Sequence, residues 1–489
     1  MKRRHTENSK NLFEHSKRDI KLLRSFSKSS RDSFPERNLQ SVTDKTYDVI
    51  IIGAGMAGIS AAMTLEAQGI SNYIILEAKD HIGGRTYTED EEFEGDKIPV
   101  DAGAMWIHGG SSNPLNDIAK EVNIPTSLST YNQRVYDANG GGAISNTILN
   151  QVYNQNFENG FMRYQASQQE STDIDEPLER SAYTYASSVS DSLKKRVLQH
   201  LYSSLIELDY SGTLSKLSLW WWDSDWVLGD DDFLVPGGFG NLVQKYAIPI
   251  SSKVETETIV TKVNYKFDII RVITNKGRFK GKRVICSAPL GVLKAKSIIF
   301  RPKLPKKHRV AIKRLGMGTM NKIFLFWKSS DVFWPQNIEM LGDATDRDTN
   351  FSFFNFMSYN GNKPFLAALF HGSQAEQFET LYSISDPESY KQEIRDLAMI
   401  SLRNMFGSNI PMPEKVIVTN WNADEFTRGS YSFNKVNMKP KHRKNLASPI
   451  KQGKLIFAGE ATDHRYFQTV HGAYFSGKDA ANKVIASLS

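Results

Sequence analysis

The segment Asp48-Val49-Ile50-Ile51-Ile52-Gly53-Ala54-Gly55-Met56-Ala57-Gly58 decides the fold of this chain. Residues 49–52 form a short, β-branched and continuously apolar run, which is typical of a buried parallel strand. A helical pattern over residues 59–68 follows the glycine-rich turn and ends at Gly69. A second apolar run, residues 73–76, ends at Glu77. The sequence therefore predicts a strand–helix–strand unit with a right-handed crossover.

The three glycines of the turn have the spacing of a dinucleotide-binding fingerprint. Gly53 allows the tight turn, Gly55 lets the backbone approach a pyrophosphate, and Gly58 lets helix and strand pack closely. The helix N-terminus would offer free N–H groups to the phosphates, and Glu77 would accept hydrogen bonds from ribose hydroxyls. Nicotinamide and flavin dinucleotides share this fingerprint, and a glycine-rich turn without a ligand is the simpler alternative.

Composition sets wider limits. The chain has 489 residues, of which 40% are hydrophobic and 24% charged, as in ordinary soluble globular proteins. It contains no apolar run of membrane-spanning length, so no membrane anchor is expected. The single cysteine, Cys286, excludes a disulfide within the chain and a cysteine zinc cage, and no metal site is expected. A reducing compartment is favoured; we expect the cytoplasm, with the nucleus as the alternative because of Lys2-Arg3-Arg4.

The positive charge of the chain is concentrated at its start. The formal net charge is +7, and residues 1–45 hold twelve Lys and Arg against six Asp and Glu. The remaining residues hold 49 basic and 48 acidic side chains. We therefore expect a basic, mostly disordered tail over residues 1–45 and an almost neutral body. Since nucleic-acid binding needs a concentrated positive face, only the tail is expected to offer one, and no nucleic acid is required as a partner.

Further motifs follow Glu77. Residues 83–85 read Gly-Gly-Arg, residues 101–109 DAGAMWIHG, residues 236–238 PGG, residues 289–294 PLGVLK, residues 429–432 GSYS, residues 459–462 GEAT and residues 469–473 TVHGA. With these segments, almost the whole ordered chain resembles the flavin-containing amine oxidase family. The PLGVLK segment is similar to the branch that holds polyamine oxidases and lysine-specific histone demethylases.

The resemblance implies an α/β fold: a Rossmann-like, two-domain FAD-binding fold of the amine oxidase type with a mixed-sheet substrate domain. Residues 46–110, 231–300 and 441–489 would form the discontinuous FAD-binding domain, and residues 111–230 and 301–440 the substrate-binding domain. The implied FAD-binding residues are Gly53, Gly55, Gly58, Glu77, Arg85, Met105, Trp106, Val260, Trp421, Glu460, Thr469 and Val470. Monoamine oxidases carry a cysteine bonded to the flavin where this chain has Ser430, so FAD should be bound non-covalently.

The resemblance also implies hydride transfer from a neutral amine to flavin N5, followed by reoxidation by O2 to hydrogen peroxide. Lys322 matches a lysine that contacts flavin N5 through water, and His108 matches a histidine near the substrate amine of animal-type polyamine oxidases. Tyr431 would form one aromatic wall of the amine site. The opposite wall of monoamine oxidases aligns with Thr469, which weakens a monoamine interpretation. The catalytic candidates are thus Lys322, His108 and Tyr431, with Thr469 also facing the substrate.

Residues 205–232 suggest a polycationic substrate. This stretch holds seven acidic residues against Lys216 alone, and it contains Trp220 to Trp222 and Trp226. Carboxylates would hold distal ammonium groups, and aromatic faces would hold methylenes. The simpler interpretation is that the tryptophans belong to the core, which we favour for the triple tryptophan, and that the acids line a solvated loop. Glu207 is our candidate for an acid that reaches the substrate.

The best interpretation is an FAD-dependent polyamine oxidase acting on spermine, spermidine or an N-acetyl derivative. Four alternatives stay open. A histone-lysine demethylase shares two motifs, although we expect no room here for its added helical module and coiled-coil insertion. A monoamine oxidase remains possible, and an L-amino-acid oxidase would need an arginine such as Arg428 or Arg465. The last alternative is a flavin-stabilised binding module with low turnover. The preferred polyamine, the cleavage side and the oligomeric state are left open.

Overall fold

The computed structural model describes residues 41–140, 142–229, 231–345, 351–355, 363–382 and 386–488. A tail is predicted over residues 1–45, and residues 1–40 of it lie outside the described residues. Residues 41–45 do not belong to a tail, because strand β1 (Ser41–Ile52) already begins at Ser41. Ser41 pairs with Arg278, and the register then shifts before Thr46. The first strand is therefore longer at its N-terminal end than the apolar run predicts.

The first sheet is built around this strand. Its order is β10-β2-β1-β13-β12-β11-β14, with β22 also pairing with β13. The strands around β1 pair in parallel, whereas β11, β12 and β13 are antiparallel neighbours. The bounds are β2 (Tyr73–Leu76), β10 (Val254–Glu255), β11 (Val260–Asn264), β12 (Ile270–Thr274), β13 (Gly277–Cys286), β14 (Ile299–Arg301) and β22 (Leu455–Phe457).

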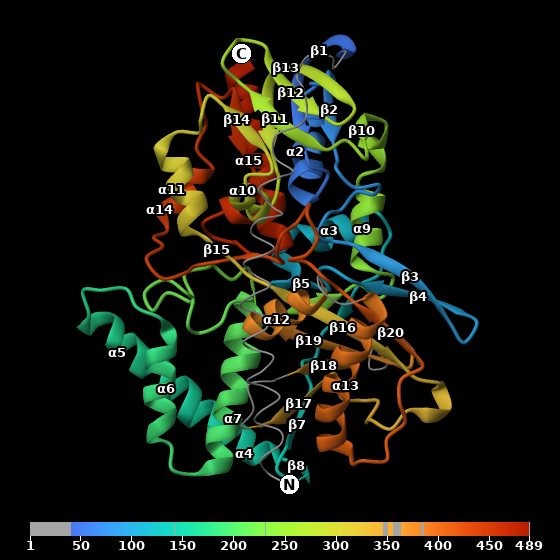
Figure 1. The fold of residues 1–489 in the computed structure, drawn as a ribbon, viewed down its shortest axis with the longest axis vertical. Helices are drawn as coiled ribbons and strands as arrows, with labels where there is room; N and C mark the ends of the chain where they lie inside the picture. Colours follow the sequence, from blue (N-terminus) through green and yellow to red (C-terminus); the bar gives the residue numbers. More distant parts are fainter. Residues whose placement is uncertain are drawn as a thin grey trace.

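Two helices pack on the first sheet. Helices α2 (Met56–Ala67) and α15 (Val470–Leu488) lie side by side at the upper end of the molecule, although they are far apart in sequence (Figure 1). Ala57, Ala61 and Ala480 belong to one buried cluster with Val49 and Ile51 of β1. A Cβ atom at Gly477 would lie 2.1 Å from the carbonyl oxygen of Ala57, so only glycine permits this close helix packing. The predicted strand–helix–strand unit is confirmed.

The second sheet lies in the lower half of Figure 1. Its order is β20-β16-β19-β18-β17-β7-β8. Helix α13 (Pro387–Phe406) covers one face, where Ile394 and Leu402 pack with Ile323 and Leu325. The bounds are β7 (Gln133–Asp137), β8 (Gly142–Ala143), β16 (Met320–Phe326), β17 (Met340–Ala344), β18 (Ser352–Asn355), β19 (Phe365–His371) and β20 (Lys415–Val418). The two mixed sheets confirm the predicted fold class, while the exact domain boundaries stay a prediction.

A helical layer lies beside the second sheet. It consists of α4 (Asn146–Gln151), the π-helical segment 152–162, α5 (Arg163–Ser171), α6 (Leu178–Ser188) and α7 (Ser192–Tyr202). A π-helical turn over residues 203–207 then leads into α8 (Leu208–Tyr210). Trp222 is buried in the core of this layer, Trp220 packs against the same core, and Trp221 packs against the core of the first sheet. The core assignment is thus confirmed for Trp222, while Trp220 and Trp221 are partly buried at the edges of two cores and Trp226 is 59% exposed.

The remaining elements connect these layers. Short strands pair as β3 with β4, β5 with β9 and β6, and β15 with β21. Their bounds are β3 (Thr88–Phe93), β4 (Asp96–Asp101), β5 (Trp106–His108), β6 (Ser127–Leu128), β9 (Asp232–Leu234), β15 (Gly316–Met317) and β21 (Ser432–Phe433). The other helices are α3 (Pro114–Glu121), α9 (Phe239–Tyr246), α10 (Leu290–Ala295), α11 (Lys306–Arg314), α12 (Gly372–Tyr382) and α14 (Lys441–Leu446). Among the described helices, none has both the length and the apolarity needed to cross a membrane.

Candidate cofactor and amine site

The glycine-rich turn after β1 forms a cradle at the N-terminus of α2. Gly53 has a φ of +95°, which favours glycine, and a Cβ atom at Gly58 would lie 2.0 Å from the carbonyl oxygen of Gly53. A Cβ atom at Gly55 would meet nothing closer than 3.8 Å, so this glycine borders open space. No side chain caps the helix at Gly55. The free N–H groups of the first turn are therefore available to an anion.

Glu77 closes this cradle from the end of β2. Its Oε2 accepts a hydrogen bond from the backbone N–H of Ala54 at 2.6 Å, and its Oε1 accepts one from the N–H of Lys79 at 2.9 Å. Burial raises the pKa of the Glu77 carboxyl, while these backbone hydrogen bonds oppose the rise. Each oxygen can accept a further hydrogen bond, so the contacts are compatible with the predicted ribose role.

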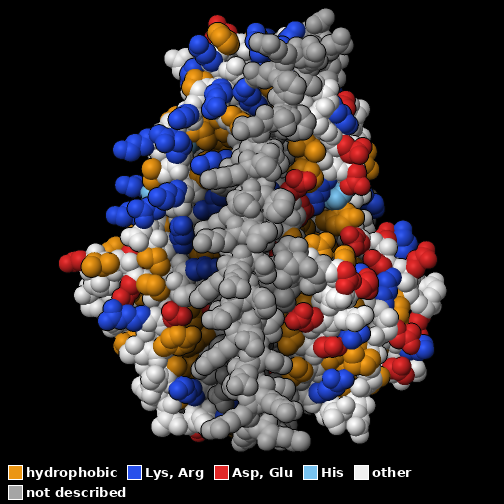
Figure 2. Space-filling model, in the orientation of Figure 1, with side chains coloured by type: hydrophobic (Ala, Val, Ile, Leu, Met, Phe, Trp, Pro, Cys, Tyr) orange, Lys and Arg blue, Asp and Glu red, His pale blue; other side chains and the backbone are white. Residues whose placement is uncertain are grey.

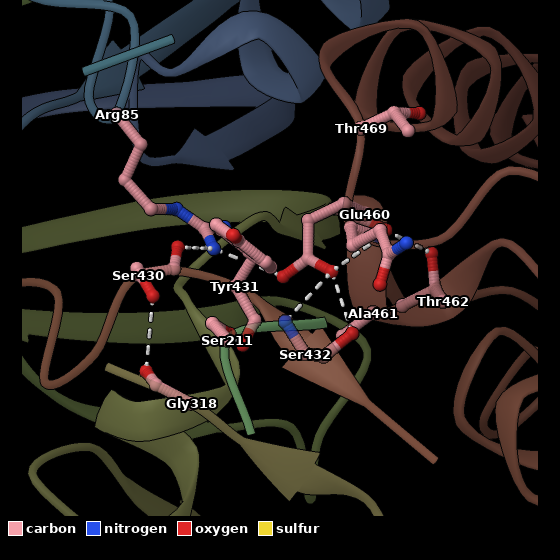
Figure 3. Close-up of polar contacts among 12 residues, drawn as sticks. Arg85, Ser211, Gly318, Ser430, Tyr431, Ser432, Glu460, Ala461, Thr462 and Thr469 are labelled. Atoms are coloured by element: carbon pink, nitrogen blue, oxygen red, sulfur yellow. Dashed lines mark hydrogen bonds and ion pairs between the residues drawn. The ribbon is translucent and has the colours of Figure 1, made fainter. Parts of the chain in front are cut away.

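Arg85 and Glu460 form an ion pair between two distant segments. The Arg85 Nη1 lies 2.9 Å from Oε1 of Glu460 and also donates to the carbonyl oxygen of Ser430 at 2.7 Å (Figure 3). The other carboxylate oxygen of Glu460 accepts a hydrogen bond from the Ser432 hydroxyl at 2.6 Å. Burial opposes the charge on Glu460, but Arg85 and this hydroxyl hold the pKa of Glu460 below its usual value. The predicted phosphate contact of Arg85 would use its remaining N–H groups.

Lys322 lies in β16 and is 1% exposed. Its Nζ donates to the carbonyl oxygen of Asp101 at 2.7 Å and to that of Gly103. Burial lowers the pKa of Lys322, and the charge of Asp101 opposes this effect. The indole N–H of Trp421 donates to the carbonyl oxygen of Ala102 at 3.2 Å. Lys322 and Trp421 thus hold the same three-residue segment, and the structure brings these two predicted residues together.

His108 lies at the mouth of the site, at the end of β5. Its Nδ1 is 2.7 Å from Oδ2 of Asp232, and half of its side chain is exposed. The hydroxyl of Tyr131 also donates to this carboxylate. Burial alone would raise the pKa of Asp232, but the hydrogen bonds and charge of its neighbours hold that pKa below its usual value. A carboxylate only accepts hydrogen bonds, so Nδ1 carries a proton and Nε2 is the ring nitrogen that can accept one.

Asp209 is the second carboxylate of this region, and sequence reasoning did not single it out. Asp209 is exposed, although the protein atoms around its carboxyl group raise its pKa to about 7 by desolvation. The charge of His108 lowers this pKa, and the charges of Asp225 and Asp232 raise it. Asp225 accepts a hydrogen bond from the Tyr210 hydroxyl at 2.9 Å. The acid-rich composition of residues 205–232 was the available signal, but it could not rank the individual acids.

Glu207, the predicted acid, lies in the π-helical turn before α8. Its Oε1 accepts a hydrogen bond from the backbone N–H of Leu214 at 2.8 Å. The hydroxyl of Tyr431 donates a hydrogen bond to the carbonyl oxygen of Leu208 at 2.6 Å. Burial is the larger cause of the raised pKa of Tyr431, and the negative charge of Asp209 is the second cause. The structure therefore places Tyr431 beside Asp209, whereas the role of Glu207 stays a prediction.

The other predicted residues surround these groups. Ser430 accepts a hydrogen bond from the N–H of Met320 at 2.9 Å through its hydroxyl, which cannot form a thioether. The hydroxyl of Thr469 accepts a hydrogen bond from the N–H of Gly472 at 3.0 Å, at the start of α15 and next to Val470. Figure 3 shows Thr469 apart from Arg85 and Glu460. Met105 is buried, the indole N–H of Trp106 is buried without a partner in the described part of the chain, and Val260 begins β11.

Three features show that these residues fit a flavin dinucleotide. The helix N-terminus of α2 is uncapped, and open space borders Gly55. Two further glycines of the predicted cofactor segments also border open space: a Cβ atom at Gly237 would meet no atom within 4 Å, and one at Gly459 would meet none closer than 4.0 Å. Gly55, Gly237 and Gly459 therefore each leave room for a bound group.

Comparisons with known proteins agree with this geometry. A family model described as flavin containing amine oxidoreductase matches residues 56–485. Polyamine oxidase 2 of Arabidopsis thaliana is 30% identical over 458 residues, which cover 89% of this chain and 88% of the relative. Lysine-specific histone demethylase 1 homolog 1 of the same plant is 31% identical over 446 residues, covering 89% of this chain and 52% of the relative. The chain thus spans about half the length of that relative.

A solved structure adds evidence for the fold. A double mutant of putrescine oxidase, redesigned in its cofactor binding, superposes with a TM-score of 0.68 at 18% identity and covers 90% of this chain and 100% of its own. At this identity, the likeness supports the fold alone. The family model and the polyamine oxidase relative carry the assignment further: this chain belongs to the flavin-containing amine oxidoreductase family, whose members depend on FAD.

Proposed function

We propose that this chain oxidises a polyamine, such as spermine, spermidine or an N-acetyl derivative. The observation that carries the proposal is the group of carboxylates formed by Asp209, Asp225 and Asp232 beside His108. A substrate with several ammonium groups fits such a group better than a monoamine does, because each additional positive charge gains a nearby carboxylate. The aromatic rings of Tyr131 and Tyr431 lie in the same region, as their contacts with Asp232 and Leu208 show.

The described residues suggest how such a substrate would be handled. FAD, when bound, supplies an acceptor for the hydride that leaves the carbon beside the amine nitrogen. That nitrogen must be uncharged, and Nε2 of His108 can accept a proton from it because Asp232 holds the opposite ring nitrogen. Asp209 and Asp225 would hold the distal ammonium groups. Lys322 would fix the segment 101–103 against the reacting end of the cofactor.

A screen of peroxide release tests this proposal. The holoenzyme is supplied with spermine, spermidine, their N-acetyl forms, a monoamine and an L-amino acid, and the products are identified by mass spectrometry. We expect the highest kcat/KM with one of the polyamines. Higher kcat/KM with the monoamine or the amino acid would overturn the proposal, and the absence of turnover with every amine would favour a binding module.

Lysine demethylation is the second candidate, because demethylase homologues are among the relatives. Lysine-specific histone demethylase 1 homolog 3 of Oryza sativa subsp. japonica is 32% identical over 450 residues, covering 89% of this chain and 53% of the relative. A basic peptide with a methylated lysine would also suit the carboxylates. The same screen with a dimethyl-lysine peptide separates the two candidates: formaldehyde release that exceeds the turnover of every polyamine would favour demethylation.

We further propose that the protein works in the cytoplasm. The support is that Cys286 is the single cysteine of the chain, so no disulfide within the chain calls for an oxidising compartment. Fractionation of cells that express the full chain tests this location. Recovery of the protein in the nuclear fraction would instead favour an address in the basic N-terminal residues.

A further inference from the structure

The near-neutral charge of the body conceals a strongly positive surface. No acidic residue lies between Asp268 and Asp331, and none lies between Glu425 and Glu460. These two stretches contain α11 and α14, which pack against each other. Lys and Arg side chains gather at the left edge of the molecule in Figure 2, where Figure 1 draws these two helices. The expectation that only the tail offers a positive face is therefore wrong.

We call this surface the basic face and define it by eight exposed side chains. Lys306 and Lys313 are seven residues apart, as are Lys307 and Arg314, so each pair projects from nearly the same side of α11. The opposite side of the helix packs into the core through Ala311. The complete set is Lys306, Lys307, Arg309, Lys313, Arg314, Lys439, Lys441 and Lys444.

The charges of the basic face are not neutralised within the described part of the chain. None of the eight side chains forms an ion pair with another described residue. The cations instead influence one another: burial and the charges of Lys441 and Arg314 lower the pKa of His442. Burial and the charges of Arg314 and Lys313 likewise lower the pKa of Lys435. Such a surface can neutralise the phosphates of a nucleic acid and release the cations condensed on it.

The chemistry of the face selects among possible polyanions. Protein interfaces usually centre on exposed aromatic or aliphatic anchors, and membrane-surface helices expose an apolar side. Here the large apolar side chains of both helices point inward, except for Val310, which is 37% exposed. A cavity of about 400 Å³ borders the face, and Asp173, Ile174, Asp175 and Trp220 line it together with Arg314, Lys439 and Lys441 of the face.

From this arrangement we propose that the basic face binds the phosphate backbone of a nucleic acid without reading its sequence. Unpaired lysine and arginine side chains on two adjacent helices supply positioning contacts to phosphates, and they carry no base-reading chemistry of their own. The face lies on α11 and α14, whereas His108 and Asp209 lie on β5 and α8. The exposed cations of the face therefore belong to other elements than the predicted amine-site residues His108 and Asp209.

The test measures the affinity of the full chain for a random-sequence DNA duplex at several salt concentrations. The fourfold variant Lys306→Gln, Lys307→Gln, Lys313→Gln and Arg314→Gln removes four charges from the face. The matched control, Lys97→Gln, Lys120→Gln, Lys245→Gln and Lys391→Gln, removes four charges from elements elsewhere on the chain. Both variants keep the same N-terminal residues, so that any contribution from them cancels. Melting temperature and flavin absorbance show whether the variants fold.

We expect the face variant to bind at least tenfold more weakly at low salt, with a slope of log K against log salt that is shallower by about 3 to 4. The control should keep the slope of the wild-type chain. Equal slopes for the face variant and the control would overturn the proposal, as would tighter binding to anionic lipid vesicles or to an acidic peptide than to the duplex at equal salt.

Discussion

Arg85 and Glu460 are 375 residues apart in sequence, yet Nη1 of Arg85 lies 2.9 Å from Oε1 of Glu460. The same nitrogen donates a hydrogen bond to the carbonyl oxygen of Ser430. This pair joins the loop after β2 to the segment after β22 and to the loop before β21. Glu460 is 4% exposed, so its charge depends on its partners. The contact therefore connects three cofactor segments that the sequence places far apart.

We predict that Arg85→Ala destabilises the protein by about 3 kcal/mol, because removing one partner leaves a buried charge without full compensation. The denaturant midpoint of the FAD-free protein measures the change, and Arg85→Lys serves as the control because it keeps the positive charge. A loss below about 1 kcal/mol would mean that Ser432 and Arg443 satisfy Glu460 without Arg85.

We predict that Glu77→Ala weakens FAD binding at least tenfold. The substitution removes the acceptor for the N–H groups of Ala54 and Lys79, which shape the glycine-rich turn. Equilibrium dialysis of FAD against the FAD-free protein measures the affinity. Glu77→Gln is the matched control, since it keeps one carbonyl oxygen, and it should lose less affinity. Full FAD loading of Glu77→Ala at the wild-type concentration would contradict a cofactor role for Glu77.

The cofactor end of the site could be predicted from sequence because its chemistry is local. The turn from Gly53 to Gly58 needs a positive φ and a close helix approach, and glycine alone supplies both within six residues. The ion pair between Arg85 and Glu460 could not be predicted in this way, because the residues around Arg85 do not indicate which distant acid it contacts.

The amine end was harder to predict because the helix phase changes there. The π-helical turn over residues 203–207 shifts the following residues relative to a regular helix. Residue spacing alone therefore could not decide whether Glu207 or Asp209 faces the site. The basic face was missed because α11 and α14 are remote in sequence. A net charge near zero also does not show whether positive and negative side chains are separated on the surface.

We predict that Lys322→Met keeps bound FAD but slows flavin reduction or reoxidation at least tenfold, equivalent to about 1.4 kcal/mol in the barrier. Methionine cannot donate to the carbonyl oxygens of Asp101 and Gly103. Anaerobic and aerobic stopped-flow measurements of flavin absorbance separate the two half-reactions. Lys328→Met is the control, because Lys328 follows the same strand but pairs with Glu414 at the surface. Unchanged rates in both half-reactions would exclude the proposed role.

We predict that the KM for spermine falls as the pH rises through about 7, because the pKa of Asp209 is raised to about 7 and its carboxylate forms over this range. Asp209→Asn should raise KM several-fold above pH 7 and flatten this pH dependence, while kcat changes less. Glu207→Gln is the matched comparison: if it raises KM more than Asp209→Asn does, Glu207 is the acid that holds the substrate.

The same carboxyl group gives a stability prediction of known sign. The pKa of Asp209 is raised to about 7 in the folded protein, whereas the usual value of 3.8 applies to the unfolded chain. Between these values the folded state binds more protons, so the contribution of Asp209 makes the protein less stable as the pH rises. Asp209→Asn should therefore raise the melting temperature at pH 8 relative to the wild-type chain but leave it almost unchanged at pH 4. An equal shift at both pH values would show that the substitution acts through packing and not through the carboxylate charge.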